Sequence, residues 1–164
     1  MKSIYENIAK QLSEKIPELA WIDLDNGQLD YAEYRAAVDF PAVLISIDYP
    51  QCEDIGLNGI QQCIASITLR LVMQVFDETN LSAPEDVRAR GMAIYDLVNK
   101  IQETLQWRMP NENTGILSRR SVIREKRDDG LAVVTIIYNT TVTDTKHYCP
   151  DVSYVTVSPV IITD

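Results

Sequence analysis

The clearest signals in the chain are two long segments in which apolar residues recur at regular intervals. Between Gln62 and Asp77 they alternate with polar residues, which predicts a strand with one buried and one solvated face. After Ser82 they recur at steps of four and three, which predicts a long helix with one apolar or small face (Val87, Gly91, Ile94, Val98, Ile101, Leu105). Ser82 and Glu85 fit a capping box at its start. Because Gly91 has no side chain, we expect it to let this helix approach the sheet closely.

The N-terminal third predicts one helix and two strands. The helix is expected from Ser3, which heads a capping box, to Pro17, because apolar residues are spaced by four along one face. A short strand is predicted at residues 21–24. The run PAVLISID, residues 41–48, predicts a core strand that ends at Pro50.

The C-terminal part predicts a β-hairpin followed by an extended tail. Two strands, at roughly 116–127 and 131–143, flank the hairpin signal Asp-Asp-Gly at residues 128–130. An alternating apolar run follows at residues 152–162. We expect this run to form either an edge strand of its own subunit or a strand added to the sheet of a neighbour.

The order of these elements predicts the fold class. Helical and strand segments do not alternate one for one, so we expect an α+β fold. Its mostly antiparallel, twisted β-sheet would carry the N-terminal helix and one long central helix on one face. The expected domain spans residues 1–144, with residues 145–164 as a C-terminal extended or β tail. With 164 residues, of which 46% are hydrophobic, the chain is large enough for one core.

Composition limits the expected partners and compartment. The formal net charge of −9 argues against a nucleic-acid binder and against docking on an anionic membrane. No apolar run approaches the ~20 residues of a membrane span, and the N-terminus does not have the pattern of a signal peptide. Cys52, Cys63 and Cys149 are widely spaced. We therefore expect no disulfide framework, a buried thiol at Cys63 and a reducing cytoplasm.

No residue pattern points to a reaction. His147 is two residues from Cys149, but a structural zinc site needs four ligands in paired spacings, so an ordinary surface histidine is the better interpretation. A Cys–His nucleophilic pair would need the fold to bring Cys52 or Cys63 to His147. A cluster of carboxylates favours a solvated acidic loop over a calcium loop, because the ligand order is incomplete (Asp23, Asp25, Asp30, Glu33). We expect no catalytic residue, no cofactor and no metal site.

The charge is unevenly distributed along the chain. Residues 1–60 hold four Lys or Arg against eleven Asp or Glu, a balance of −7. Residues 84–127 hold nine against six, a balance of +3. Five of these basic residues lie in the predicted hairpin (Arg119, Arg120, Arg124, Lys126, Arg127). They either keep a solvated edge strand from aggregating or form a subunit interface that pairs with the acidic half of another copy.

Five segments in this order resemble the tail terminator, or tail completion, proteins of long-tailed bacteriophages and prophages, the family that includes the phage lambda tail terminator. The first two are the short helix IYENIAKQL and the core strand PAVLISID. The long strand ITLRLVMQVFD leads directly into the helix APEDVRARGMAIYDLVNKIQETL. The hairpin REKRDDGLAVVTIIYNTTVTD completes the pattern. The resemblance covers roughly residues 3–144, and the small members of the family do not need the tail from Thr145 onward.

The resemblance implies a non-catalytic structural protein. It implies a homohexameric ring that ends polymerisation of the tail tube and presents a surface to the head or neck. The implied partners are further copies of the chain, the tail-tube protein and a head or neck connector protein, with DNA only as passing cargo. The implied location is the bacterial cytoplasm during assembly and then the virion tail. An acidic ring would repel the DNA that passes through it.

Two other functions stay open at this point. One is a different component of the same particle, such as a head-closure protein or a tail-tube subunit. The other is a small cytoplasmic enzyme or ligand-binding domain with a pocket between the long helix and the sheet. That function would require convergent polar groups and at least one strongly perturbed pKa.

Overall fold

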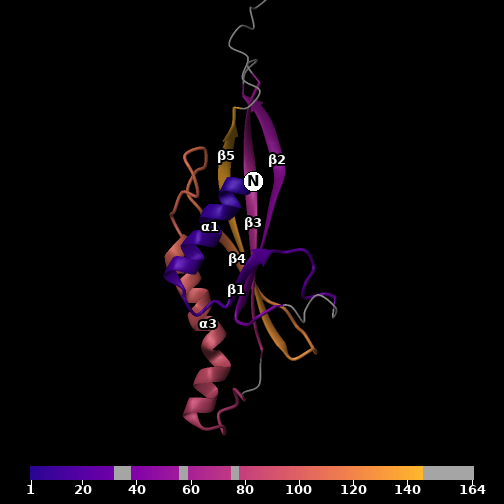
Figure 1. Cartoon of the computed structure of the whole chain (residues 1–164), viewed down its shortest axis with the longest axis vertical. Helices are drawn as coiled ribbons and strands as arrows, with labels where there is room; N and C mark the ends of the chain where they lie inside the picture. The colour runs from indigo at the N-terminus through magenta and orange to yellow at the C-terminus, as the bar shows by residue number, and fades with distance from the viewer. Residues whose placement is uncertain (32–37, 56–58, 75–77, 146–164) are drawn as a thin grey trace, which may run out of the picture.

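A five-stranded sheet carries two helices on one of its faces (Figure 1). The computed structural model describes residues 1–31, 38–55, 59–74 and 78–145. The elements in chain order are α1 (Lys2–Lys15), β1 (Trp21–Leu24), β2 (Ala42–Ile55), β3 (Ile60–Gln74), α3 (Glu85–Leu105), β4 (Ser118–Arg124) and β5 (Leu131–Asp144). The sheet order is β1-β2-β3-β5-β4, in which β1 pairs parallel with β2 and the other pairs are antiparallel. The predicted α+β class is confirmed.

The main core lies between the helices and the sheet. In β3 the residues that face the helices are fully buried, as the alternating pattern predicts (Cys63, Ala65, Ile67, Leu69, Leu71). The apolar stripe of α1 packs on them through Ile4, Ile8 and Leu12. β5 adds Val134, Ile136 and Tyr138 to the same core. Burial of this apolar layer supplies most of the driving force that holds both helices to the sheet.

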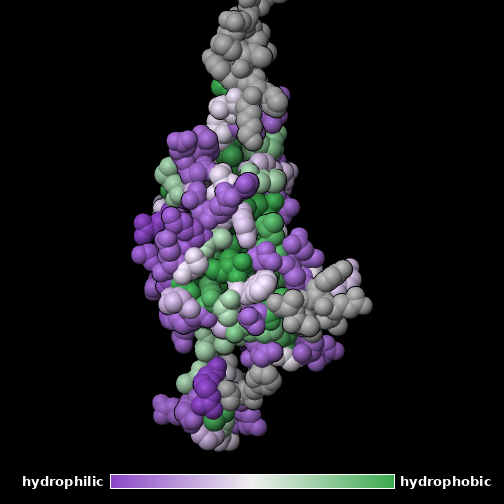
Figure 2. Space-filling model, in the orientation of Figure 1, coloured by the Kyte–Doolittle hydropathy of each residue, from purple (hydrophilic) through white to green (hydrophobic). Residues whose placement is uncertain are grey.

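The long helix packs on the sheet along its C-terminal half. The buried residues of α3 begin at Ile94 (Ile94, Leu97, Val98, Ile101, Leu105). Val87 and Gly91 are half-buried, so they precede the buried part of the predicted stripe. Figure 1 shows the start of α3 extending past the lower end of the sheet, and Figure 2 shows mostly hydrophilic residues there. The close approach of α3 to the sheet at Gly91 stays a prediction, since the buried residues of the helix begin one turn later, at Ile94.

Both predicted capping boxes are absent. α1 begins with Met1 as its N-cap and α3 with Pro84, and neither cap residue forms a side-chain hydrogen bond. The Ser3 hydroxyl instead accepts a hydrogen bond from Asn111 Nδ2 at 3.1 Å. Ser82 lies in a turn, where its backbone N–H donates to Asn80 Oδ1 at 2.9 Å. Because Pro84 is extended, with ψ of 148°, α3 starts after it rather than at Ser82.

The strand β2 continues past Pro50, contrary to the prediction that it ends there. The register with β3 shifts between Asp48 and Gln51, which indicates a β-bulge around the proline. A bulge tolerates proline because it interrupts the ladder at the position that lacks an N–H. The longer β2 forms a hairpin with β3 that extends well beyond the helices.

This hairpin contains a disulfide bond between Cys52 and Cys63. The two residues are direct register partners across β2 and β3, with Cα atoms 4.0 Å apart. The expectations of no disulfide and of a free buried thiol at Cys63 are therefore wrong. Spacing along the sequence did not predict this bond. Cys52 and Cys63 become register partners only because β2 continues beyond Pro50.

The predicted C-terminal hairpin is confirmed, with a shorter first strand. β4 spans Ser118–Arg124 rather than residues 116–127, and it forms one edge of the sheet. Gly130 adopts a φ of +76° in the turn, a conformation that glycine tolerates without strain. The predicted tail strand, together with His147 and Cys149, lies outside the described residues. In the part of the chain that the structure describes, no helix is long and apolar enough to cross a membrane.

The opposite face of the sheet is only partly covered. Near β1, a second and smaller apolar cluster includes Leu29, Leu44, Val72 and Val133. Further along, the side chains on this face are half-buried and mostly polar (Ser46, Ser66, Thr68, Thr135, Asn139). We call this side the open face, and the opposite side the helix face.

Candidate subunit interface

The basic residues of the β4–β5 hairpin are divided between the two faces of the sheet. Arg119 pairs in register with Tyr138 and Arg124 pairs with Val134, and both partners belong to the core beneath the helices. Arg119 and Arg124 therefore lie on the helix face. There the Nη1 atom of Arg124 donates a hydrogen bond of 2.9 Å to the hydroxyl of Tyr95 on α3.

Arg120 lies on the open face, opposite to Arg119, because successive side chains of a strand alternate between its two faces. It lines a shallow pocket of about 360 Å³ together with Asn139 and Thr141. Lys126 is exposed beyond the end of β4. Within the described residues, neither Arg120 nor Lys126 has a carboxylate at salt-bridge distance. These two side chains therefore carry uncompensated positive charge at the edge of the sheet.

Arg127 is turned inward and differs from the other members of the basic cluster. Its side chain is 15% exposed and donates hydrogen bonds to Asp129 Oδ2 at 2.6 Å and to the carbonyl of Leu29 at 3.0 Å. It also lies within 3.6 Å of Asp30 and 3.5 Å of Glu125. Arg127 thus binds groups of its own subunit and has little surface left for a partner.

Arg70 is the centre of the same ion network. It projects from β3 onto the open face, and its side chain is 14% exposed. The guanidinium lies 3.3 Å from Asp25, 3.2 Å from Asp30 and 3.2 Å from Glu125. It therefore connects the loop after β1 and the end of β4 to the middle of the sheet.

The network lowers the pKa of two of its carboxyl groups. The hydrogen bond from Arg70 is the largest influence on Asp30 and lowers its pKa. Burial raises the pKa of Glu125, but hydrogen bonds from Thr135 and Arg70 outweigh burial and lower it overall. Both groups are stabilised as carboxylates. The network therefore stabilises the fold above the ordinary carboxyl pKa of about 4, and this contribution is lost as the pH falls through the lowered values.

The sequence pattern did not reveal this network. It predicted Arg70 only as one of several outward-facing polar residues of an alternating strand, and the carboxylates at 23–33 as a solvated loop. Instead, the side chain of Asp25 is 15% exposed and paired with Arg70. The available signal was the single arginine among uncharged neighbours in β3. Such a charge on a half-buried face needs a partner.

Acidic charge without an ion-pair partner is found at the far end of the β2–β3 hairpin. Several other carboxylates of residues 1–60 are paired within the subunit: Glu6 with Lys2, Glu14 with Lys10, and Glu18 with Lys100. At the hairpin end, Glu53 accepts a hydrogen bond of 2.6 Å from Gln51, and Asp54 accepts one of 2.8 Å from Gln61. Both carboxylates are exposed, and no cation lies at salt-bridge distance from them in the described part of the chain.

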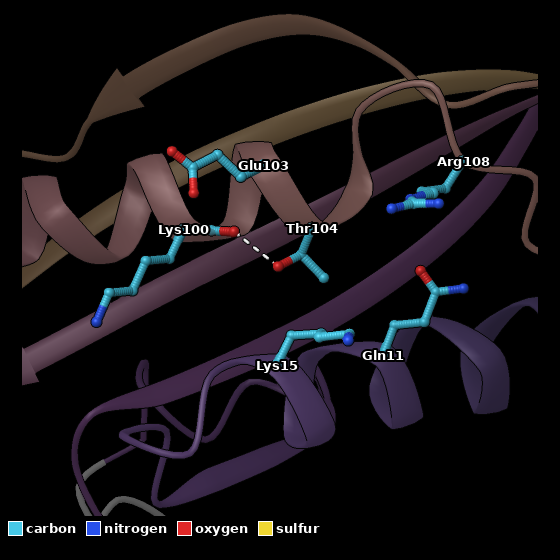
Figure 3. A pocket seen from close by; sticks show the side chains of 6 residues that line it. All are labelled: Gln11, Lys15, Lys100, Glu103, Thr104 and Arg108. Atoms are coloured by element: carbon cyan, nitrogen blue, oxygen red, sulfur yellow. Dashed lines mark hydrogen bonds between the residues drawn. The ribbon is translucent and has the colours of Figure 1, made fainter.

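A basic groove lies between the two helices (Figure 3). Its volume is about 700 Å³, and its lining residues carry three positive charges and one negative charge (Gln11, Lys15, Lys100, Glu103, Thr104, Arg108). The groove is open to solvent at the surface of the helix layer. It is not the pocket between the long helix and the sheet that a ligand-binding domain would require, since that space is filled by the core.

The buried hydroxyl of Tyr138 has a structural partner within the core. Burial raises the pKa of Tyr138 to about 12, and its hydroxyl donates a hydrogen bond of 2.8 Å to Gln102 on α3. Among the described residues, no cluster of three or more His, Cys, Asp or Glu side chains is arranged to hold a metal ion.

Comparisons with known proteins found structural likeness but no match in sequence. No family model matches the chain, and no curated protein matches it. Among solved structures, the chain is similar to a component of the virion of a native gene transfer agent particle, with a TM-score of 0.46 and 6% sequence identity. The match covers 86% of this chain and 92% of the other. A likeness this distant carries no functional argument by itself.

Proposed function

We propose that this protein is a structural component of a phage-like particle and that it acts as a tail terminator. In this role it forms a ring on the last ring of tail-tube subunits, stops their polymerisation and presents a surface to the head or neck. The order of elements that underlies the sequence resemblance supports this proposal. Each of the five resembling segments overlaps a helix or a strand of the described fold, in the same order.

The observation that carries the proposal is the separation of unpaired charge on a single small subunit. Among the described residues, Arg120 and Lys126 have no ion-pair partner at the β4 edge, and Glu53 and Asp54 have none near the end of the β2–β3 hairpin. A ring of identical subunits needs two different, complementary surfaces on each copy. When the two surfaces carry opposite charge, neighbouring subunits attract each other in one orientation. Contacts that bring two surfaces of like charge together are disfavoured.

The proposed ring surrounds a channel through which DNA passes. The net charge of −9 supports this role because an acidic wall repels phosphate and does not retain the DNA. The proposed protein therefore has no catalytic residue and no cofactor. Its partners are copies of itself, the tail-tube protein and a neck or connector protein. It assembles in the bacterial cytoplasm and remains in the finished tail.

Native mass spectrometry over a range of protein concentrations, with and without tail tubes, tests the proposal. We expect a closed hexamer, formed by the protein alone or on added tubes. The double variant Arg120→Glu/Lys126→Glu should raise the concentration needed for assembly. The control Lys2→Glu/Lys10→Glu changes the net charge equally, on an exposed part of α1, and should assemble normally.

Three outcomes would contradict parts of this proposal. A chain that stays monomeric and ignores tail tubes contradicts the structural role. Open-ended polymers of unlimited length would instead identify a tail-tube subunit. Normal assembly of Arg120→Glu/Lys126→Glu would remove the β4 edge from the interface while leaving the terminator role intact.

A further inference from the structure

We propose that the groove between α1 and α3 binds the acidic end of the β2–β3 hairpin of a second copy of this chain. This inference rests on the proposed ring, and within that ring it gives the groove, rather than the β4 edge, as the basic surface that the acidic end of the hairpin contacts. The contact joins Lys15 and Arg108 of one subunit to Glu53 and Asp54 of the next.

The groove has the charge needed to hold carboxylates. Figure 3 shows the side chains of Lys15, from α1, and Arg108, from the segment after α3, on opposite sides of one opening. Neither side chain has a carboxylate at salt-bridge distance within the described residues. Lys100 is already paired with Glu18. The two unpaired cations are therefore the groups available to an incoming acidic segment, and Gln11 and Thr104 line the space between them.

The hairpin end has the complementary charge and a defined shape. The carboxylates of this hairpin lie in β2, at Asp48, Glu53 and Asp54, and its outer part, residues 48–66, contains no lysine or arginine. The Cys52–Cys63 disulfide holds its two strands together directly beside Glu53. Because a cross-linked hairpin loses less conformational freedom on docking, more of its electrostatic attraction is retained as binding free energy.

The two surfaces of one subunit lie too far apart on a rigid sheet to meet each other. The outer part of the β2–β3 hairpin extends beyond both helices (Figure 1), whereas the groove is lined by residues of α1, α3 and the segment after α3. Contact between them therefore requires a second subunit. Two different surfaces joined head to tail generate a closed ring when the rotation between neighbours closes.

The dimensions of the groove suit this occupant. Its volume of about 700 Å³ falls within the range of pockets that enclose a small ligand, so it has room for several side chains but not for a folded domain. Its open side admits a protruding hairpin. Because the attraction is between solvent-accessible charges, the contact should weaken as salt increases.

Charge exchange between the two surfaces tests the contact. We expect Lys15→Glu/Arg108→Glu and Glu53→Lys/Asp54→Lys each to raise the concentration for half-assembly about tenfold or more, since several exposed ion pairs become repulsive. The quadruple variant, which carries all four reversals in one chain, restores the complementarity and should assemble nearly as well as the wild type. Assembly is measured by sedimentation velocity, with circular dichroism to verify folding.

The Lys2→Glu/Lys10→Glu variant serves again as the control of equal charge, because both residues lie on α1 outside the groove. If Lys15→Glu/Arg108→Glu assembles as well as this control, the groove assignment is wrong while the ring proposal stands. If it assembles normally but no longer binds tail tubes, the groove belongs to the tube protein and the inference is overturned. If the quadruple variant does not recover assembly, the two surfaces are not partners. A wild-type chain that never assembles contradicts both proposals.

Discussion

The two faces of the sheet are stabilised by different interactions. On the helix face, α1 and α3 bury a continuous apolar layer that includes Leu12, Leu69 and Ile101. On the open face, a smaller apolar cluster lies beside an ion network in which Arg70 and Arg127 bind four carboxylates (Asp25, Asp30, Glu125, Asp129). The helix face should therefore tolerate changes of pH and salt, and the open face should respond to both. The interactions on the open face and at the β4 edge are therefore the ones whose strength changes with pH and salt.

The largest expected effect is loss of packing on the helix face. Ile101 is fully buried, so Ile101→Ala should lower the free energy of unfolding by about 3 kcal/mol through lost apolar burial and the cavity left behind. Urea denaturation at pH 7 and at pH 4 should give the same loss, because no titratable group is removed. The matched variant Ile123→Ala, at an exposed position of β4, should cost less than about 0.5 kcal/mol. Equal losses at the two positions would contradict the assignment of the core to this face.

Removal of the central arginine tests the open face. Arg70→Met should lower the free energy of unfolding at pH 7 by about 2 kcal/mol, less than for a fully buried pair because Asp30 is half exposed. Asp25, Asp30 and Glu125 would then repel one another without a counter-charge. The lowered pKa values of Asp30 and Glu125 stabilise the wild type above pH 4 and cease to do so as the pH falls below it, so the variant and the wild type should converge in acid.

The control for this variant is Arg120→Met, on the same face but outside the network. It should leave both the stability and its pH dependence close to those of the wild type. A loss for Arg70→Met that stays constant from pH 7 to pH 3 would show that the arginine acts through packing of its aliphatic part, not through charge.

The same contrast explains which parts of the fold the sequence predicted. Alternation in β3 and the spacing of apolar residues in α1 and α3 are local patterns, and they correctly predicted the elements of the helix face. The hairpin turn at Gly130 is equally local. Features that depend on register were not predictable in this way. Three such features arise from residues that pair across strands or from separate parts of the chain. They are the extension of β2 past Pro50, the Cys52–Cys63 bond and the carboxylates that pair with Arg70.

The candidate interface shows the same limit. The basic cluster at 119–127 is contiguous in sequence, but alternation along β4 divides Arg119 and Arg120 between the two faces of the sheet. The structure also pairs Arg127 internally, which no local pattern indicates. The groove between the helices was missed because its cations, Lys15 and Arg108, are far apart in the chain and each appears ordinary in its own segment.

The smallest expected effect concerns the contact between the β4 edge and α3 at the start of the buried section of the helix. Arg124 donates its hydrogen bond to Tyr95, near the point where α3 begins to pack on the sheet. Because the pair is exposed, Arg124→Met should change global stability by less than about 0.5 kcal/mol. Hydrogen exchange of amides in the first turns of α3 should nevertheless become about twofold faster, since local opening responds to a local contact. Lys126→Met is the matched control and should leave that exchange unchanged. If both variants leave exchange unchanged, the start of α3 is held by its own apolar contacts, and β4 is then free to move against a neighbouring subunit without loosening the helix.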